Sequence, residues 1–176
     1  MSKGKVVLVL TIDSIPPNNW GENLRKYLEP EVWDFVRKEV YKHFGYKCAA
    51  CGLTDIECHC HEDWEFNDSR HLQTLKGFLC LCPDCHSIKH FPRQLSLHRQ
   101  RKITNKELLR LKYHFCDVNK VNLSYLNLYL DYINRTQRKY RSSFEYKLDW
   151  GKLPPERINS IWKRYKDGKG PKSFQM

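Results

Sequence analysis

The sequence predicts an α+β fold in which a short N-terminal strand and several helices surround a segment rich in cysteine and histidine. Three observations predict it. Residues 5–12 form a short apolar run typical of a strand, apolar residues recur at helical spacing in several later segments, and two CxxC pairs bracket residues 52–81. A chain of 176 residues is long enough to bury a real core, as one compact domain or as a domain with an appendage.

The chain is basic, and its charge is unevenly distributed. The formal net charge is +11; the first 92 residues carry 11 Lys and Arg against 13 Asp and Glu, whereas the remainder carries 20 against 7. Such a segregated excess indicates a polyanionic partner, of which nucleic acid is the first candidate. For any single basic residue, a solvated surface position is the alternative. The side chains that we expect to contact phosphate groups are Arg93, Arg99, Arg101, Lys102, Arg135, Arg138 and Lys139.

Helices are predicted on both sides of the cysteine-rich segment. Before it, residues 30–44 carry apolar side chains at helical spacing, with Pro30 suited to the first turn and Gly45 to the C-terminal cap. A shorter helix is expected at residues 20–28, and residues 92–102 are expected to form a basic loop. Three helices are predicted after that loop, at residues 104–118, 122–140 and 154–166.

These boundaries divide the chain into four predicted parts. They are residues 1–45 with the N-terminal strand and helices, residues 46–92 as the cysteine- and histidine-rich core, residues 93–166 as a basic helical appendage, and residues 167–176 as a flexible tail. We see neither a secretory signal peptide nor an apolar run of about 20 residues. A cytoplasmic location without membrane insertion is therefore expected.

The two CxxC pairs predict a structural zinc site. Each pair places two thiolates three positions apart on a tight turn, and two such turns supply the four ligands of tetrahedral zinc. The predicted ligands are Cys48, Cys51, Cys82 and Cys85. Two buried or redox-active pairs are the less favoured alternative in a chain without secretory features. Of the remaining cysteines, Cys116 is expected in a helical core, whereas Cys58 and Cys60 could belong to a second metal site.

A second group of metal-binding residue types lies around the second CxxC pair. His61 and Glu62 precede it, and His86 and His90 follow it. On a helix that starts near Pro83, the latter two histidines are four positions apart and share a face. Lone histidines are usually ordinary surface or core residues, but several beside a zinc site in a basic protein favour a functional site. The pair therefore predicts a clamp for a divalent ion.

These motifs resemble those of the HNH nucleases, members of the ββα-metal superfamily. The resemblance is carried by the pattern CxxCG…CHEDWEF…LKGFLCLCPDCHSIKH, which looks like a bacterial group with a CHExW core and an LCPxCHxxKH ending. It extends loosely over residues 8–153. The resemblance implies that two antiparallel strands lead into a short helix, so the expected fold is a zinc-stapled ββα-metal core with an N-terminal strand and flanking helices.

The resemblance also implies an activity, the metal-dependent hydrolysis of phosphodiester bonds in DNA. His61 matches the family's general base, which deprotonates the attacking water. His86 and His90 match the positions that hold Mg²⁺ or a similar ion such as Mn²⁺ or Ni²⁺. Glu62 or Asp63 could orient a ligand or donate an oxygen to the metal. The family thus implies an endonuclease with a structural zinc and a second, catalytic divalent ion.

The sequence departs from the family pattern at two positions. Cys60 stands where a metal-binding Asp, Glu or His often precedes the base, and Gly77 stands where an Asn is common. His71 and Gln73 lie upstream as substitutes for that Asn. These departures leave the full ligand set open, and softer ligands would favour Mn²⁺, Ni²⁺ or Zn²⁺ over Mg²⁺. His59 is an alternative base, although the HExW spacing favours the histidine two positions later.

Two other functions are compatible with the sequence. One is a catalytically inactive, zinc-stabilised module that only binds nucleic acid, and the other is a module that binds a protein, as an inhibitor or an accessory subunit. The histidines favour the nuclease, because a mere binding module does not need them at this spacing. We expect DNA rather than RNA as the partner, and a homodimer or a protein partner if both strands of a duplex are cut.

Overall fold

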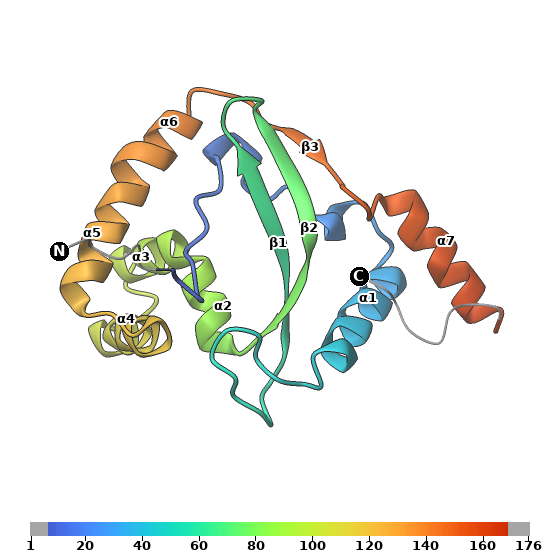
Figure 1. Cartoon of the computed structure of the whole chain (residues 1–176), viewed down its shortest axis with the longest axis horizontal. Coiled ribbons are helices and arrows are strands. Elements are labelled where there is room, and N and C mark those ends of the chain that lie inside the picture. The colour runs from blue at the N-terminus through green and yellow to red at the C-terminus, as the bar shows by residue number, and fades with distance from the viewer. Residues whose placement is uncertain (1–6, 169–176) are drawn as a thin grey trace.

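The computed structural model describes residues 7–168 of the chain, without the side chains of residues 136–138. Its elements in chain order are α1 (Pro30–His43), β1 (His59–Asn67), β2 (Leu72–Leu81), α2 (Pro83–Lys89), α3 (Phe91–Arg99), α4 (Asn105–Asn119), α5 (Leu123–Tyr132), a π-helical segment (Ile133–Arg138), α6 (Lys139–Arg141), β3 (Lys147–Asp149) and α7 (Pro155–Lys166). The strands form a sheet between two groups of helices, with α2 to α6 on one side and α1 and α7 on the other (Figure 1). The α+β fold predicted from the sequence is confirmed.

The sheet is built on a long hairpin. Strands β1 and β2 pair antiparallel from His59 opposite Leu81 to Asn67 opposite Leu72, with an irregularity between Asp63 and Trp64. The short strand β3 pairs parallel with β2 on its other side, so β1 is an edge of the described sheet. Helix α2 begins directly after β2, which gives the chain the β–β–α order that the sequence motifs implied. Strand β3 was missing from the sequence prediction, because three residues carry no recognisable alternation.

The predicted N-terminal strand is wrong for the part of it that the structure describes. Residues 7–12 join no sheet, although Leu10 and Ile12 are buried. Instead, the side chain of Asn119 at the end of α4 replaces a partner strand. Its Oδ1 accepts hydrogen bonds from the backbone N–H groups of Val9 and Leu10, both at 2.9 Å, and its Nδ2 donates to the Leu10 carbonyl at 2.9 Å. The Asn119 amide therefore forms the hydrogen bonds that the backbone of this segment would otherwise make to a neighbouring strand.

We expect Asn119→Ala to lower the free energy of unfolding by more than the loss of a single polar side chain usually does. The change leaves the buried backbone groups of Leu10 and the partly buried N–H of Val9 without partners; a fully buried group costs about 1–3 kcal/mol, so a total loss of about 2–4 kcal/mol is expected. Chemical denaturation measures it. Asn127→Ala on the exposed face of α5 is the matched control and should change the free energy of unfolding little. Equal stabilities of the two variants would contradict this role of Asn119.

The helices agree with the sequence prediction in part. Helix α1 matches, with Gly45 in the left-handed conformation after it (φ 58°), and α4 starts with the capping box of Thr104 and Glu107. The expected basic loop is wrong, because α3 occupies it and buries Phe91 and Pro92 at its start. The helix expected at residues 122–140 is divided by the π-helical segment.

The segment that follows the predicted N-terminal strand is also less regular than expected. Residues 20–28 contain only a short 3₁₀ turn, Leu24–Lys26, in place of a helix. Gly21 has a φ of 92°, and Asn23 is fully extended, so neither residue can continue a helical turn. This irregular backbone places Leu24 and Arg25 beside β1, where both bear on the site described below.

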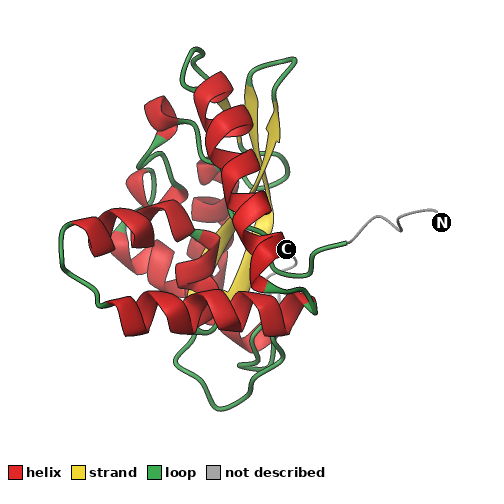
Figure 2. Ribbon diagram, turned by 90° about the vertical axis from the view of Figure 1, so that its left-hand side faces the viewer, coloured by secondary structure: helices red, strands yellow, loops and turns green. Residues whose placement is uncertain are grey.

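Two apolar cores lie on the two sides of the sheet. One packs α2, α4 and α5 together around buried residues such as Ile88, Phe115 and Leu126. The other packs α1 and α7 against the hairpin around Val36 and Ile158. The view in Figure 2 looks onto the first side, where the helices lie in front of the strands. The cysteine and histidine side chains of α2 and β1 are consequently anchored from both sides of the hairpin.

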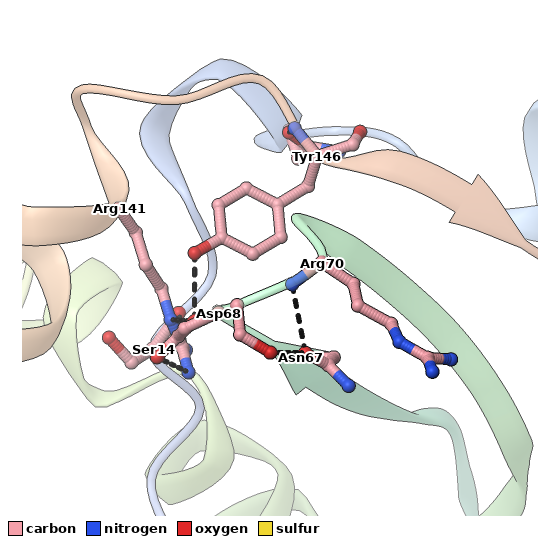
Figure 3. Close-up of polar contacts among 8 residues, drawn as sticks. Ser14, Asn67, Asp68, Arg70, Arg141 and Tyr146 are labelled. Atoms are coloured by element: carbon pink, nitrogen blue, oxygen red, sulfur yellow. Dashed lines mark hydrogen bonds and ion pairs between the residues drawn. The ribbon is translucent and has the colours of Figure 1, made fainter.

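An ion pair at the hairpin turn connects three distant parts of the chain (Figure 3). Arg141 Nε lies 2.7 Å from Asp68 Oδ1, and its guanidinium also donates to the Ser14 carbonyl at 2.6 Å. The Tyr146 hydroxyl donates to the same carboxylate at 2.7 Å. Burial alone would raise the pKa of Asp68, but these partners outweigh it and the pKa is lowered. The guanidinium thereby fixes the backbone next to residue 13.

Candidate metal centre and active site

The four cysteines of the two CxxC pairs come together in a compact cluster. Their sulfur atoms all lie within 4.8 Å of one another, and Sγ of Cys51 is 3.8 Å from Sγ of Cys82. The first pair sits on a turn in which Gly52 donates to the Cys48 carbonyl. The second pair begins α2, where the Cys85 N–H donates to Cys82 Sγ at 3.4 Å. The cluster suggests a structural zinc site that joins this turn to the start of α2.

The thiols of the cluster influence one another in the way that a zinc site requires. The pKa of Cys48 is lowered to about 4, mainly because the Cys85 thiol donates a hydrogen bond to it. In return the pKa of Cys85 is raised, and burial with the neighbouring negative charge raises that of Cys82 to about 11. Without a cation, one thiolate suppresses the ionisation of its neighbours. A bound dication removes this repulsion, so the donor set fits zinc.

His114 is an additional partner of this cluster that the sequence did not indicate. Its Nε2 lies 3.2 Å from Sγ of Cys85, although it belongs to α4. An N–H donated to a metal-bound thiolate orients the ligand and reduces its charge. The contact depends on how α4 packs against α2, and no spacing motif connects His114 to the CxxC pairs.

Three histidines form the second cluster. The structure brings His61 from β1 together with His86 and His90 from α2 and its end, with one nitrogen of each ring within 4.8 Å of the others. Burial and the neighbouring rings lower the pKa of His86 to about 3 and that of His90 to about 4. Both rings are therefore neutral at physiological pH, the form in which imidazole binds a metal. A donor set of three imidazoles fits a divalent transition ion.

Asp13 reaches the histidines from the N-terminal segment, and the sequence analysis missed it. Its Oδ2 lies 3.0 Å from His61 Nε2, and its Oδ1 accepts from Lys89 Nζ at 2.9 Å. Burial would raise the pKa of Asp13, but the close contact with His61 and the charge and hydrogen bond of Lys89 lower it. The buried Nε2 of His61 has no well-aligned hydrogen-bond partner among the described residues. An unpaired buried nitrogen next to a carboxylate is the donor arrangement that suits a bound cation.

His59 contacts the histidine cluster from outside. Its Nδ1 lies 3.0 Å from Nδ1 of His86, which leaves the other ring nitrogen of His86 free to bind an ion. Metal-binding histidines usually engage their second nitrogen in this way, which fixes the tautomer and the ring orientation. Of the two histidines considered as the base, His61 is the one that the structure brings into the cluster.

Glu62 is a buried carboxyl beside the cluster. Its Oε1 accepts from the Leu24 backbone N–H at 2.9 Å, and its Oε2 accepts from Trp64 Nε1 at 3.0 Å. Burial raises the pKa of Glu62 to about 7, despite these two hydrogen bonds. A carboxyl group that titrates near neutral pH is suited to proton transfer.

A cavity of about 400 Å³ opens beside these groups. Because β1 is an edge strand, His61 on one of its faces and Glu62 on the other both line it. The guanidinium groups of Arg25 and Arg93 also line the cavity, together with Cys60. Arg25, Arg93 and Cys60 also line an adjoining cavity of about 760 Å³. The two cavities adjoin at these shared residues, and acidic side chains line them as well: Asp13, Glu22 and Glu62 in the first, Asp34 and Glu57 in the second.

The other residues expected to bind nucleic acid lie on the exposed surface. Arg93 is at the cavities, and the exposed residues that lie elsewhere are Arg99, Arg101, Lys102, Arg135 and Lys139. The side chain of Arg138 lies outside the described residues. The sequence analysis missed Arg25 and Arg37, which line the larger cavity from a turn and from α1, because the N-terminal part is not basic overall.

The remaining cysteines take no part in either metal cluster of the described chain. Cys60 lies opposite Cys80 in the hairpin register, and burial raises its pKa to about 12. It is therefore a neutral thiol rather than a ready ligand. Cys58 lies in the same apolar core, and Cys116 is buried in α4 as predicted.

Comparisons with protein-family models, with curated proteins and with solved structures found no match. No helix within residues 7–168 is both long and apolar enough to span a membrane.

Proposed function

We propose that this chain is a metal-dependent endonuclease of the HNH type, which hydrolyses phosphodiester bonds in DNA. One observation carries the proposal: His61, His86 and His90 converge at a cavity that Arg25 and Arg93 also line. Metal-binding nitrogens beside guanidinium groups are the chemistry that a phosphodiester requires. The β–β–α order of the segment and its resemblance to HNH nucleases support the same class.

In this proposal His86 and His90 hold the catalytic ion, and Mn²⁺ or Ni²⁺ suits their imidazoles better than Mg²⁺. When bound, such an ion supplies charge stabilisation for the phosphate and for the leaving 3′ oxygen. Arg25 and Arg93 bind the phosphate through charge-assisted hydrogen bonds. The zinc cluster acts indirectly, since Cys85 and His86 are neighbours on α2 and the cluster therefore fixes the orientation of the histidine.

Two divisions of labour are compatible with this geometry. In the first, His61 is the general base, and the carboxylate of Asp13 stabilises the protonated ring after it accepts a proton. In the second, His61 is a third metal ligand, and Glu62 accepts the proton from water. The buried, unpaired Nε2 of His61 favours the second, whereas the hydrogen bonds that already occupy both carboxylate oxygens of Glu62 favour the first.

Plasmid cleavage tests the proposal. The full chain is incubated with supercoiled plasmid and Mg²⁺, Mn²⁺ or Ni²⁺, or with no added divalent ion, because a chelator could remove the structural zinc. We expect nicked plasmid only with an added ion. His90→Ala should lower the rate by more than about 100-fold, since residues that merely orient metal ligands already cost about 10–100-fold. His43→Ala, an exposed histidine on α1, is the control and should cleave normally.

The result that would overturn the proposal is an intact plasmid with every ion. A protein that retards the plasmid on a gel without cutting it would be an inactive nucleic-acid-binding module. A protein that neither binds nor cuts nucleic acid would support the protein-binding alternative. Zinc content measured on the same samples ensures that the comparison is made on folded protein.

A further inference from the structure

We propose that the smaller cavity binds an unpaired nucleobase, so that the substrate is single-stranded or locally unpaired nucleic acid. This inference rests on the proposed nuclease function, because it assigns a place to the base next to the phosphate being cut. A base within a duplex is stacked and paired, and it enters a pocket in the protein surface only when it leaves the helix. The pocket therefore distinguishes between two classes of substrate that phosphate contacts alone cannot distinguish.

The walls of the cavity are unusually aromatic. Trp20, Trp33 and Trp64 all line it, and its volume of about 400 Å³ lies within the range of about 300–1,000 Å³ typical of small-ligand sites. Two of these indoles are fixed: Trp64 donates its N–H to Glu62, and the Arg25 guanidinium lies 5.1 Å from the ring of Trp33. Indole faces bind bases of any sequence by stacking, because every base has a π-face.

Trp20 is the indole that is available to a ligand. It is 51% exposed at the rim of the cavity, and no other described ring packs against it. A single exposed tryptophan is ordinary on a protein surface, but one that lines a pocket presents its indole to whatever enters the pocket. Its position on the irregular segment before Gly21, at the mouth of a pocket rather than on a flat surface, indicates a partner that enters the pocket.

A polar group in the same cavity points independently to a ligand with hydrogen-bond donors. The side chain of Gln73 on β2 is only 1% exposed, yet its Oε1 has no hydrogen-bond partner among the described residues. Buried amide groups are nearly always satisfied, and an unpaired one costs about 1–3 kcal/mol. Gln73 lines the cavity but its Oε1 is covered, so a nucleobase with an exocyclic amine or a ring N–H supplies the missing donor once the amide turns toward the ligand.

The cavity also holds the metal-binding histidines, and this sets the arrangement of the ligand. Asp13, His61, His86 and His90 line it along with the tryptophans, and Arg25 and Arg93 are common to it and to the neighbouring cavity. A nucleotide therefore fits with its phosphate at the histidines and arginines and its base against the indoles. In the neighbouring cavity, Arg37 supplies a cation for the next phosphate of the strand.

Binding of two DNA probes tests this inference without cleavage. Fluorescence anisotropy is measured for a labelled short oligothymidine and for a labelled hairpin duplex of equal charge, with the full chain and no added divalent ion. We expect the single strand to bind more tightly. Trp20→Leu should weaken its binding about 5- to 100-fold, the loss of one base–aromatic stack, while leaving duplex binding unchanged. Trp20→Phe should restore most of the affinity, and Tyr113→Leu, an exposed aromatic residue on α4, should have no effect.

Gln73→Met provides a second variant, because it keeps the volume and removes the amide. It should weaken a probe whose bases carry exocyclic amines or ring N–H groups more than it weakens an abasic strand. The inference is overturned if duplex and single strand bind alike and neither Trp20→Leu nor Gln73→Met changes the affinity. If only the nuclease proposal fails, the single strand still binds through Trp20, but no added ion produces cleavage.

Discussion

Cys85→Ser is expected to lose the bound zinc and most of the folded population. The side chain is completely buried at the start of α2, and its thiol contacts both Cys48 and His114. Structural zinc contributes about 10–16 kcal/mol of apparent binding free energy in zinc fingers, which equals or exceeds the net stability of about 5–15 kcal/mol of a typical domain. Even a fraction of that loss is sufficient to unfold the chain.

Thermal unfolding and elemental analysis of zinc measure this effect together. Cys58→Ser is the matched control, since Cys58 is half-buried and belongs to neither metal cluster of the described residues. It should retain zinc and melt close to the parent protein. If the Cys85 variant melts normally without zinc, the cluster is not a structural metal site, and the alternative of buried or redox-active pairs replaces it.

His61→Ala is expected to lower kcat for DNA cleavage by about 10²–10⁴-fold, the usual contribution of a general base, at saturating Mn²⁺. Glu62→Gln keeps the shape of the side chain and removes its ability to accept a proton, although its amide can accept only one of the two N–H groups that Glu62 binds. If His61 is the base, the Glu62 variant retains most of its activity. Both variants should keep their zinc, because neither residue contacts the cysteine cluster.

The dependence of the rate on Mn²⁺ concentration separates the two divisions of labour. If His61→Ala mainly raises the Mn²⁺ concentration needed for half-maximal rate, and excess Mn²⁺ restores kcat, His61 is a metal ligand. The large loss of kcat should then be found in Glu62→Gln. Activity of both variants at the parental level would contradict both assignments.

The sequence allowed a good prediction of those parts of the site that depend on local spacing. The CxxC pairs and the i, i+4 histidines of α2 are fixed by the geometry of a turn or a helix, so their positions along the chain predict their proximity. The hairpin that brings His61 to them was implied only by the resemblance. The structure brings all three histidines together, the expected base His61 beside the expected ligands His86 and His90.

The rest depends on contacts between distant residues, which no local pattern encodes. Asp13 and Arg25 join the site because an irregular segment crosses the end of the hairpin, and neither has a characteristic spacing from the motif. The apolar run at residues 7–12 has the composition of a strand, but Asn119 competes successfully for its backbone groups. Helix α3 was missed because its charged residues suggested a loop, whereas its buried first turn determines its structure.

The way in which Asp13 is held affects the order in which the site assembles during synthesis. On one side of it, Leu10 is bound by Asn119, which lies 109 positions later, and on the other side Ser14 is bound by Arg141, which lies 127 positions later. A growing chain folds its early segments first, and long-range contacts form only when both partners exist. The contacts of Asp13 with His61 and Lys89 can form early, but the backbone on both sides of it is held only after α4 and α6 have been synthesised. A nascent chain that already contains every motif residue therefore holds this carboxylate less firmly than the finished protein does.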